Sequence, residues 1–349
     1  MRKLNETEWK GIKLGKIADV NSGRDIYAQE RTDGMRPYVT SGTANNGIGY
    51  FVGNDNDSKA KNTISVNRNG AVGEAFYHPY EALYGNDCRR VNLHDSEDEN
   101  TQLFVAQCIS EQKEAFSYSR KLGTARLKRL HVMFPVTDSG NPDYAYMAQY
   151  ASEMRRRLLI RYKNYVVKKL SQLEHKEIPA LDEKKWGHFL MTEVFSEIQR
   201  GKRLKNADHV AGVIPYVSST ANNNGVDDYI EASKGTRVFS NCISLANSGS
   251  VGTAFFEPFE FVASDHVTSL KQDGFSKFVY LFLITVIKQQ GSNFNFNREI
   301  NDARIKKMQA MLPVTDTGKP DYAYMEQYAK NMMLRKYEQY LTFIDSRED

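Results

Sequence analysis

The sequence predicts an α+β fold in which two tandem units of mixed α and β structure are each followed by a long helix. The strongest observation is a string that occurs twice. It reads Pro-Val-Thr-Asp at 135–138 with Asp-Tyr-Ala-Tyr-Met at 143–147, and it returns 178 positions later at 313–316 and 321–325. Short segments rich in β-forming residues precede each string, and apolar residues at helical spacing follow it. A repeat of half the chain length indicates two copies of one structural unit.

Further matching residues support the duplication and place its boundaries. Trp9 corresponds to Trp186, Gly23 to Gly201, and the Thr-Ala-Asn-Asn turn at 43–46 to the same turn at 220–223. The remaining residues of the two halves differ freely, which indicates a shared scaffold that carries two different surfaces. The domains expected are a first unit at 1–142, a long helix at 143–178, a second unit at 179–320 and a second long helix at 321–349.

Within the first unit, Gly and Asn residues separate short β-type segments. This pattern predicts strands at 17–20, 37–40, 63–66, 75–77 and 90–93. The Asn- and Gly-containing stretches at 43–47 and 67–70 are typical of turns or exposed loops, because both residue types tolerate positive φ. Apolar periodicity predicts one helix at about 100–116.

The segment after each repeated string has the pattern of a long helix, at about 143–176 and 321–344. An aspartate beside proline, Asp143 or Asp321, suits a helix start because its carboxylate accepts from backbone N–H groups. Alternating four- and three-residue steps place Met147, Met154 and Tyr165 on one apolar seam, which is typical of a coiled coil. The two helices are expected to pair antiparallel and to give the chain pseudo-two-fold symmetry. Side chains expected to divide between this pair and a partner protein, most of them facing the pair, are Tyr144, Met147, Tyr150, Met154, Tyr322, Met325, Tyr328 and Met332.

Composition excludes several classes of protein. The longest apolar stretch, at 278–287, is shorter than the roughly 20 residues that cross a bilayer, and the N-terminus lacks the apolar core of a signal peptide. A cytoplasmic location is therefore expected. The three cysteines have no pairing or ligand spacing, so neither disulfides nor a metal site is expected. The net charge of +4 is small, but basic residues cluster, for example at 126–129 and 155–157.

Two short patterns resemble parts of catalytic sites, but their sequence context does not support a catalytic role. Asn141-Pro142-Asp143-Tyr144 resembles the motif of amino-methyltransferases, but the second copy has Lys319 in place of the asparagine. Asp143 and Glu174 lie at opposite ends of one expected helix and cannot share a metal ion. Glycine-rich loops for S-adenosylmethionine or for ATP are missing from the sequence. The chain is therefore expected to be non-enzymatic and to bind no cofactor.

The order of variable unit, long helix, variable unit and long helix resembles the specificity subunits of type I restriction–modification systems and of the related type IIB systems. The resemblance covers nearly the whole chain. It rests on the duplicated string, on Trp9 and Trp186, and on the Gly-containing turns at 69–73 and 248–252. The short second helix leaves type I against type IIB open.

The resemblance implies that each unit is a target recognition domain for one half of a bipartite double-stranded DNA site. It also implies that the helices bind two methyltransferase subunits that carry S-adenosylmethionine, and it leaves open whether a restriction subunit joins them. Because the two halves differ, the site is expected to be asymmetric. Bases are read by Arg, Lys, Asn and Gln side chains on a fixed scaffold.

Residues of these types on expected loops are the candidate DNA contacts. In the first unit they are Arg24, Asn45, Asn46, Arg68, Asn69, Arg120, Lys121, Arg126 and Lys128. In the second unit they are Lys202, Arg203, Asn222, Asn223, Asn224, Asn247, Ser248, Asn297, Arg298, Arg304 and Lys306. Two alternatives stay open. The chain could be an orphan or anti-restriction scaffold that occupies methyltransferase subunits, or a self-sufficient methyltransferase or nuclease, which saturable S-adenosylmethionine binding would reveal.

Overall fold

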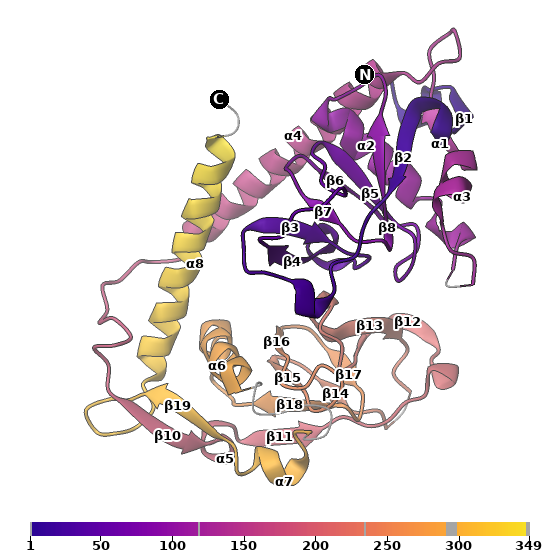
Figure 1. Ribbon diagram of the computed structural model, residues 1–349. Coiled ribbons are helices and arrows are strands. Elements are labelled where there is room, and N and C mark those ends of the chain that lie inside the picture. Colours follow the sequence, from indigo (N-terminus) through magenta and orange to yellow (C-terminus); the bar gives the residue numbers. More distant parts are fainter. Residues whose placement is uncertain (1, 118, 234, 291–298, 347–349) are drawn as a thin grey trace. The chain divides into compact units, whose positions relative to one another are not determined.

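The structure is a computed structural model that describes residues 2–117, 119–233, 235–290 and 299–346. The chain divides into two compact units, Met1–Tyr162 and Lys163–Asp349 (Figure 1). Both units mix helices with mainly antiparallel sheets, which confirms the α+β fold. The division falls inside the first long helix, so the last turns of that helix belong to the second unit.

In the residues that the structure describes, the first unit contains three small sheets. Its central sheet is antiparallel and has the strand order β2 (Ala18–Ser22), β8 (Cys88–Leu93), β5 (Thr63–Asn67) and β6 (Ala75–His78). A second sheet has the order β4 (Ile48–Val52), β3 (Arg36–Val39) and β7 (Leu83–Tyr84), in which β3 and β7 are parallel. The third pairs β1 (Trp9–Lys13) with β9 (His131–Pro135). All five expected strands are present, whereas β1, β4, β7 and β9 were not predicted.

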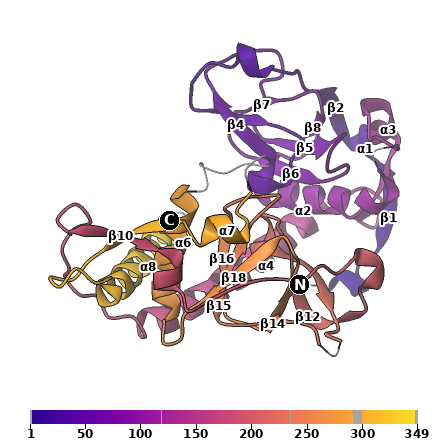
Figure 2. The same cartoon turned by 90° about the horizontal axis from the view of Figure 1, so that it is seen from below.

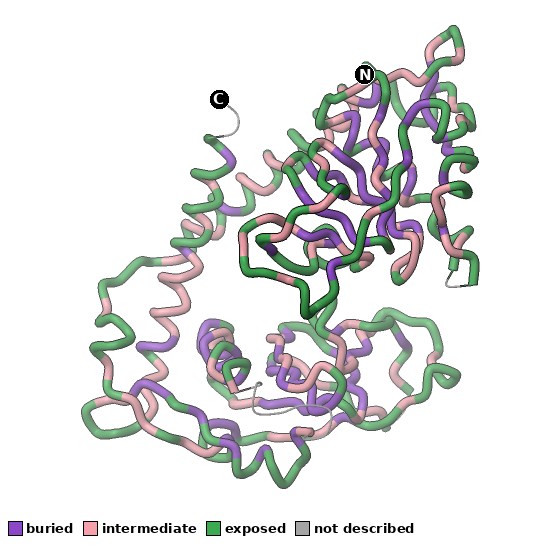
Figure 3. Tube along the Cα trace, viewed as in Figure 1, coloured by how far each residue is buried: buried purple, intermediate pink, exposed green. Residues whose placement is uncertain are grey.

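The core of the first unit lies between the central sheet and α2 (Glu99–Ser110). Helix α2 lies along the central sheet (Figure 2), and its Phe104, Val105 and Ile109 are buried in one cluster with Ile64 and Val91 of the sheet. The helix begins at Asp98, whose carboxylate accepts from the Thr101 N–H at 2.7 Å. Short helices α1 (Leu14–Ile17) and α3 (Thr124–Arg129) close the same core through Leu14 and Leu127. The buried residues accordingly concentrate along the strands (Figure 3).

The second unit repeats this plan. Its central sheet has the order β11 (Glu197–Arg200), β18 (Val267–Lys271), β15 (Cys242–Ala246) and β16 (Ala254–Glu257), and α6 (Lys277–Gln290) takes the place of α2. The second sheet has the order β13 (Val226–Ile230), β12 (Ala211–Val217), β17 (Phe261–Ala263) and β14 (Val238–Phe239). Strands β10 (Trp186–Leu190) and β19 (Gln309–Pro313) form the closing pair, and α5 (Met191–Val194) and α7 (Asp302–Ile305) correspond to α1 and α3.

The two long helices are α4 (Tyr144–Leu170) and α8 (Tyr322–Asp345). Asp143 accepts from the Tyr146 N–H and Asp321 from the Tyr324 N–H, both at 3.0 Å, so both aspartates start helices as predicted. The expected end of α8 is confirmed.

Helix α4 ends at Leu170, before the expected position. The side chain of Asn331 hydrogen-bonds both backbone groups of Lys176, and Gln327 donates to the Glu174 carbonyl at 2.8 Å. These bonds hold the segment in a non-helical path.

Within the second unit, the last turns of α4 contact α8. Lys163 Nζ lies 2.9 Å from the Asp345 carboxylate, and the rings of Tyr165 and Tyr337 pack edge to face at 6.4 Å. This order of contacts is antiparallel, as the predicted pairing requires; along the rest of the helices the pairing stays a prediction. In the last turns of α4, Val166 is buried, whereas Tyr165, which the sequence placed on the apolar seam, is 50% exposed. A valine has only apolar atoms to bury, while tyrosine keeps its hydroxyl in water.

Most of the residues that were expected at the helix pair or at the partner interface belong to the cores of the two units instead. Met147 and Met325 are fully buried in the core of their own unit. The tyrosines at 144, 150, 322 and 328 pack against these cores. The first turns of each long helix therefore complete a globular core, which is why they are unavailable to the helix pair. Tyr150, Met154, Tyr328 and Met332 also line apolar grooves at the surface of their units.

The described part of the chain holds no helix with the length and apolar character that a membrane crossing requires. In the same residues, no group of three or more His, Cys, Asp or Glu side chains is arranged to hold a metal ion.

Candidate DNA interface

Several loops of the first unit meet at one end of its central sheet. Arg24 donates its N–H to the Tyr84 carbonyl at 2.7 Å, and Arg68 donates its N–H to the Asp87 carbonyl at 2.8 Å. The Leu122 N–H in turn reaches the Arg68 carbonyl at 3.2 Å. These backbone bonds join segments that are far apart in sequence. We call residues 23–25, 40–47, 67–73, 85–87 and 119–123 the first loop cluster.

The turns of this cluster need the residue types that the sequence supplies. Asn45 and Asn46 have φ of 49° and 53°, a left-handed conformation that asparagine tolerates. Gly70 has a φ of 64°, and a Cβ at this position would lie 2.9 Å from the Ser41 carbonyl oxygen. The expected turns are confirmed. Asn45 and Asn46 are exposed at the tip of the first, whereas Asn67 of the second is buried and Asn69 is partly exposed. Rigid loops with exposed amide groups suit the reading of base edges.

The charged side chains of the first loop cluster are partly engaged with one another. Arg68 lies 3.5 Å from the Asp87 carboxylate, and Asn69 donates to the same carboxylate at 3.4 Å. Arg24 faces Asp57 at 3.5 Å, with both side chains largely exposed. Arg120 lies over the Phe116 ring at 5.7 Å. The predicted residues are therefore brought together at one surface, with two carboxylates among them.

Helices α3 and α7 carry the basic residues that recur before the repeated strings. The Arg126 guanidinium donates to the Lys121 carbonyl, and Arg304 donates to the Glu299 carbonyl at 2.6 Å. Both arginines hold the preceding loop and remain exposed at the surface. Lys128 and Lys306 are exposed as well. The same local contact in both units gives these two arginines a positioning role that the sequence did not reveal.

The second unit builds the same cluster with different side chains. Lys202 donates its N–H to the Ala263 carbonyl at 3.1 Å, Asn247 to that of His266 at 2.9 Å, and the Ile300 N–H reaches the Asn247 carbonyl at 3.0 Å. Each bond corresponds to one in the first loop cluster. We call residues 201–203, 218–225, 246–252, 264–266 and 299–301 the second loop cluster. Arg203 and the asparagines at 222–224 are exposed on it.

Two predicted base contacts of the second unit have other roles. Asn247 is 1% exposed and donates to the Thr268 hydroxyl at 3.1 Å, and Ser248 is 4% exposed and hydrogen-bonds the His266 ring. Their short side chains stay inside the loop, whereas Arg68, which corresponds to Asn247, reaches the surface. The matching backbone bonds, Arg68 N–H to Asp87 and Asn247 N–H to His266, show that His266 corresponds to Asp87. Asn297 and Arg298 lie outside the described residues.

Sequence reasoning missed basic residues on unrepeated segments. Arg237 donates to the Arg200 carbonyl at 2.8 Å, which brings it to the end of β11 beside Lys202. Arg31 of the first unit lies over the Tyr50 ring at 3.7 Å and donates to the Ile26 carbonyl at 3.2 Å. Neither has a counterpart in the other half, so the repeat gave no signal for them. The signal that could have identified them as candidate DNA contacts was a basic residue in a loop between two predicted strands.

The interior beneath each cluster contains a titratable group at the same place. In the first unit Ser65 hydrogen-bonds His78 at 2.9 Å, and burial lowers the pKa of His78 to about 4. In the second unit Ser244 donates to Glu257 at 2.8 Å, and burial raises the pKa of Glu257, partly offset by that hydrogen bond. Burial also raises the pKa of the Cys88 thiol to about 12, so it is neutral at pH 7.

The comparisons with known proteins agree on one family. A sequence model of the type I restriction modification DNA specificity domain matches the chain twice, at residues 6–160 and 183–340. The specificity subunit S.BcgI of a type II restriction enzyme from Heyndrickxia coagulans is 32% identical over 160 residues, which cover 46% of this chain and 47% of that protein. The match thus spans about half the length of this relative.

Solved structures of similar proteins align along almost the whole chain. The S subunit of a type I restriction-modification system from M. genitalium is 17% identical, with 99% of this chain and 94% of that chain covered and a TM-score of 0.47. The HsdS subunit from Thermoanaerobacter tengcongensis is 11% identical, with 98% and 92% covered and a TM-score of 0.35.

Proposed function

We propose that this chain, which belongs to the family of type I restriction modification DNA specificity domains, directs a modification complex to a bipartite, asymmetric DNA site. Each loop cluster reads one half of the site. The long helices dock methyltransferase subunits, with S-adenosylmethionine carried by those subunits. The chain itself then needs no catalytic residues and acts as the DNA-recognition subunit of the complex.

One observation carries this proposal: the same backbone cluster is built twice and presents different side chains. Arg24 in the first cluster is answered by Lys202, Arg68 by Asn247, and Asp87 by His266. Base edges are distinguished by the donors and acceptors that side chains offer, whereas the backbone frame only places them. Two frames with unlike side chains are therefore suited to two unlike half-sites. Phosphate contacts from the surrounding lysines and arginines supply affinity without sequence preference.

The test is single-molecule sequencing of N6-methyladenine in cells that express this chain with its neighbouring methyltransferase, with the methyltransferase alone as control. We expect one new asymmetric motif made of two short half-sites across a fixed gap. A palindromic motif would contradict two different half-sites. Co-purification of the two proteins without any new motif would instead support the anti-restriction scaffold.

A further inference from the structure

Each unit carries an apolar groove beside its long helix, away from the loop clusters in sequence. The first groove has a volume of 840 Å³ and is lined by Trp9, Phe104, Met133, Tyr150 and Met154. It lies between α2 and the start of α4, with the β1 and β9 pair as its floor. Several apolar side chains here face solvent: Met133 is 45% exposed and Leu103 is 40% exposed. Exposed apolar surface of this kind indicates a binding site.

The second groove is built from corresponding residues in the same geometry. It also has a volume of 840 Å³ and is lined by Trp186, Phe282, Met311, Tyr328 and Met332 between α6 and α8. The ring centroids of Trp186 and Phe282 lie 6.5 Å apart at 22°, against 6.2 Å and 21° in the first groove. Those of Phe282 and Tyr328 lie 5.6 Å apart at 87°, against 5.7 Å and 88°.

This likeness between the two grooves distinguishes them from the loop clusters. At the loop clusters the backbone is kept and the side chains change, while in the grooves the side chains themselves are kept. Both tryptophans are also fixed alike, since Trp9 and Trp186 donate to the Leu4 and Leu181 carbonyls at 2.9 Å. Two surfaces with the same shape and chemistry fit two copies of one ligand. A groove between two helices fits a third helix with an apolar stripe.

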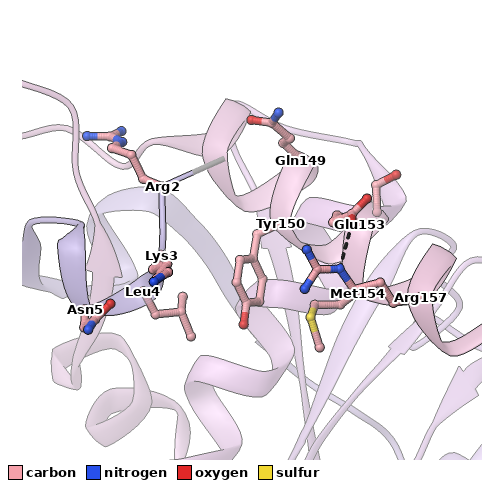
Figure 4. A pocket seen from close by; sticks show the side chains of 10 residues that line it. Arg2, Lys3, Leu4, Asn5, Gln149, Tyr150, Glu153, Met154 and Arg157 are labelled. Carbon is pink, nitrogen blue, oxygen red and sulfur yellow. Dashed lines mark hydrogen bonds and ion pairs between the residues drawn. The ribbon is translucent and has the colours of Figure 1, made fainter.

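The charged side chains at the rims differ between the two grooves. The first groove has Glu111 and Arg155, which is paired with Glu99 at 3.1 Å, and the second has Lys336. The first groove continues past Tyr150 and Met154 into a polar pocket that contains Arg2, Lys3 and Arg157 (Figure 4).

Glu153 is the carboxylate of this pocket. Its hydrogen bonds with Arg156 and Arg157 lower its pKa to about 2, so it is ionised and already paired at neutral pH. Arg2 is also paired, with Asp143 at 3.2 Å, so the apolar lining rather than charge defines the ligand of the groove.

The second groove is also continuous with a helix contact of the second unit. Tyr337 lines this groove and packs on Tyr165 of α4. A helix bound here would extend the existing contact between α4 and α8. We propose that each groove binds one amphipathic helix through an apolar stripe, supplied by a methyltransferase chain. One specificity chain thus holds two copies of the same helix. This inference rests on the proposed function, which names the methyltransferase as partner.

Native mass spectrometry of the full chain with the neighbouring methyltransferase tests the stoichiometry. Met154→Glu puts a charge into the first groove and Met332→Glu into the second. Wild type is expected to bind two methyltransferase chains, each single variant one, and the double variant none. Met154→Leu and Met332→Leu keep the apolar lining and are expected to retain two. Met35→Glu is the matched control, because Met35 is 87% exposed and lies outside both grooves.

The outcomes distinguish this inference from the proposed function. Two chains on the double variant would overturn the groove assignment and leave methyltransferase docking intact. No binding by a wild-type chain that still binds DNA would overturn the docking itself, and the groove assignment with it.

Discussion

The two units of this chain are alike in one region and unlike in another. In the grooves, Trp9 and Phe104 stack in nearly the geometry of Trp186 and Phe282. At the loop clusters the backbone bonds correspond, but the ion pair of the first unit is replaced by a hydrogen bond between Ser248 and His266. This difference is expected under the proposed function, in which both grooves face the same partner and each loop cluster faces its own half of the DNA.

The interior of the two units differs in a third way: a hydrogen bond is kept while the residue that makes it changes type. His78 and Glu257 occupy the same place on β6 and β16, each is fully buried, and each hydrogen-bonds the serine of the neighbouring strand. Burial disfavours the charged form of either residue, so it lowers the pKa of His78 and raises the pKa of Glu257. The core therefore keeps the hydrogen bond, although the residue type has changed from a base to an acid.

The largest effects should come from the shared cores. Met147→Ala and Met325→Ala each remove a fully buried side chain at corresponding places. We expect each to destabilise its own unit by roughly 2–5 kcal/mol, through lost burial and a residual cavity. Each unit has one tryptophan, so ¹⁹F-labelled indole reports urea unfolding of both units in one sample. Met35→Ala is the exposed control. A markedly unequal cost would break the equivalence of the two cores.

The buried pair predicts opposite responses to pH. His78 has a pKa of about 4 in the folded unit against 6.5 for an ordinary histidine. The unfolded state therefore binds the proton first, and the first unit loses stability as pH falls from about 6.5 towards 4, by roughly 3 kcal/mol. The pKa of Glu257 is raised above 4.5, so the folded second unit holds its proton longer and loses stability as pH rises from 4.5.

The same fluorine signals, followed in urea at pH 4.5 to 7.5, measure this difference. His78→Gln should flatten the curve of the first unit alone, and Glu257→Gln that of the second alone, because glutamine does not titrate. Parallel curves for the two wild-type units would show that other groups dominate.

Mutation of corresponding arginines should affect different half-sites in the two loop clusters. Arg126→Ala should weaken discrimination at one half-site and Arg304→Ala at the other, each by roughly 1–3 kcal/mol. The readout is the methylated motif in cells. Arg156→Ala removes an exposed cation that is paired with Glu153 and serves as the control for charge alone. Loss of the same half-site in both variants would refute the assignment of one half per unit.

The smallest effect concerns the acidic neighbour of Arg24. Asp57 faces this arginine only in the first unit, whereas Lys202 lies near Arg200 and Arg237. Asp57→Asn should raise affinity for random-sequence DNA by less than about 1 kcal/mol, because exposed pairs interact weakly. Fluorescence anisotropy should show the gain fading at high salt. Asp95→Asn, an exposed acid beyond the other end of β8, should leave affinity unchanged.

Features set by short-range chemistry could be predicted from the sequence. Asp143 caps a helix through its own carboxylate, and Asn45 and Asn46 adopt positive φ because their side chains tolerate it. The duplication also indicated matching units before any contact was known. These inferences needed no partner distant in sequence.

Features set by distant partners could not be predicted. Helix α4 ends at Leu170 because Asn331 holds the following segment, and Asn247 is buried because Thr268 lies across the sheet. The closing pair of β1 and β9 joins segments more than a hundred residues apart, and their few buried side chains gave no clear alternation. Arg237 reaches the second cluster only through the fold of its loop.

The closing strand pairs place the beginning and the end of each unit side by side. Trp9 lies opposite Pro135 in one ladder, and Trp186 opposite Pro313 in the other. A segment whose ends are neighbours can be replaced whole without moving the chain on either side. Genetic exchange between these points would supply a new set of loop tips while the long helices stay in place. Under the proposed function, new half-sites could then be acquired one at a time, without any change in the surfaces that bind the partner.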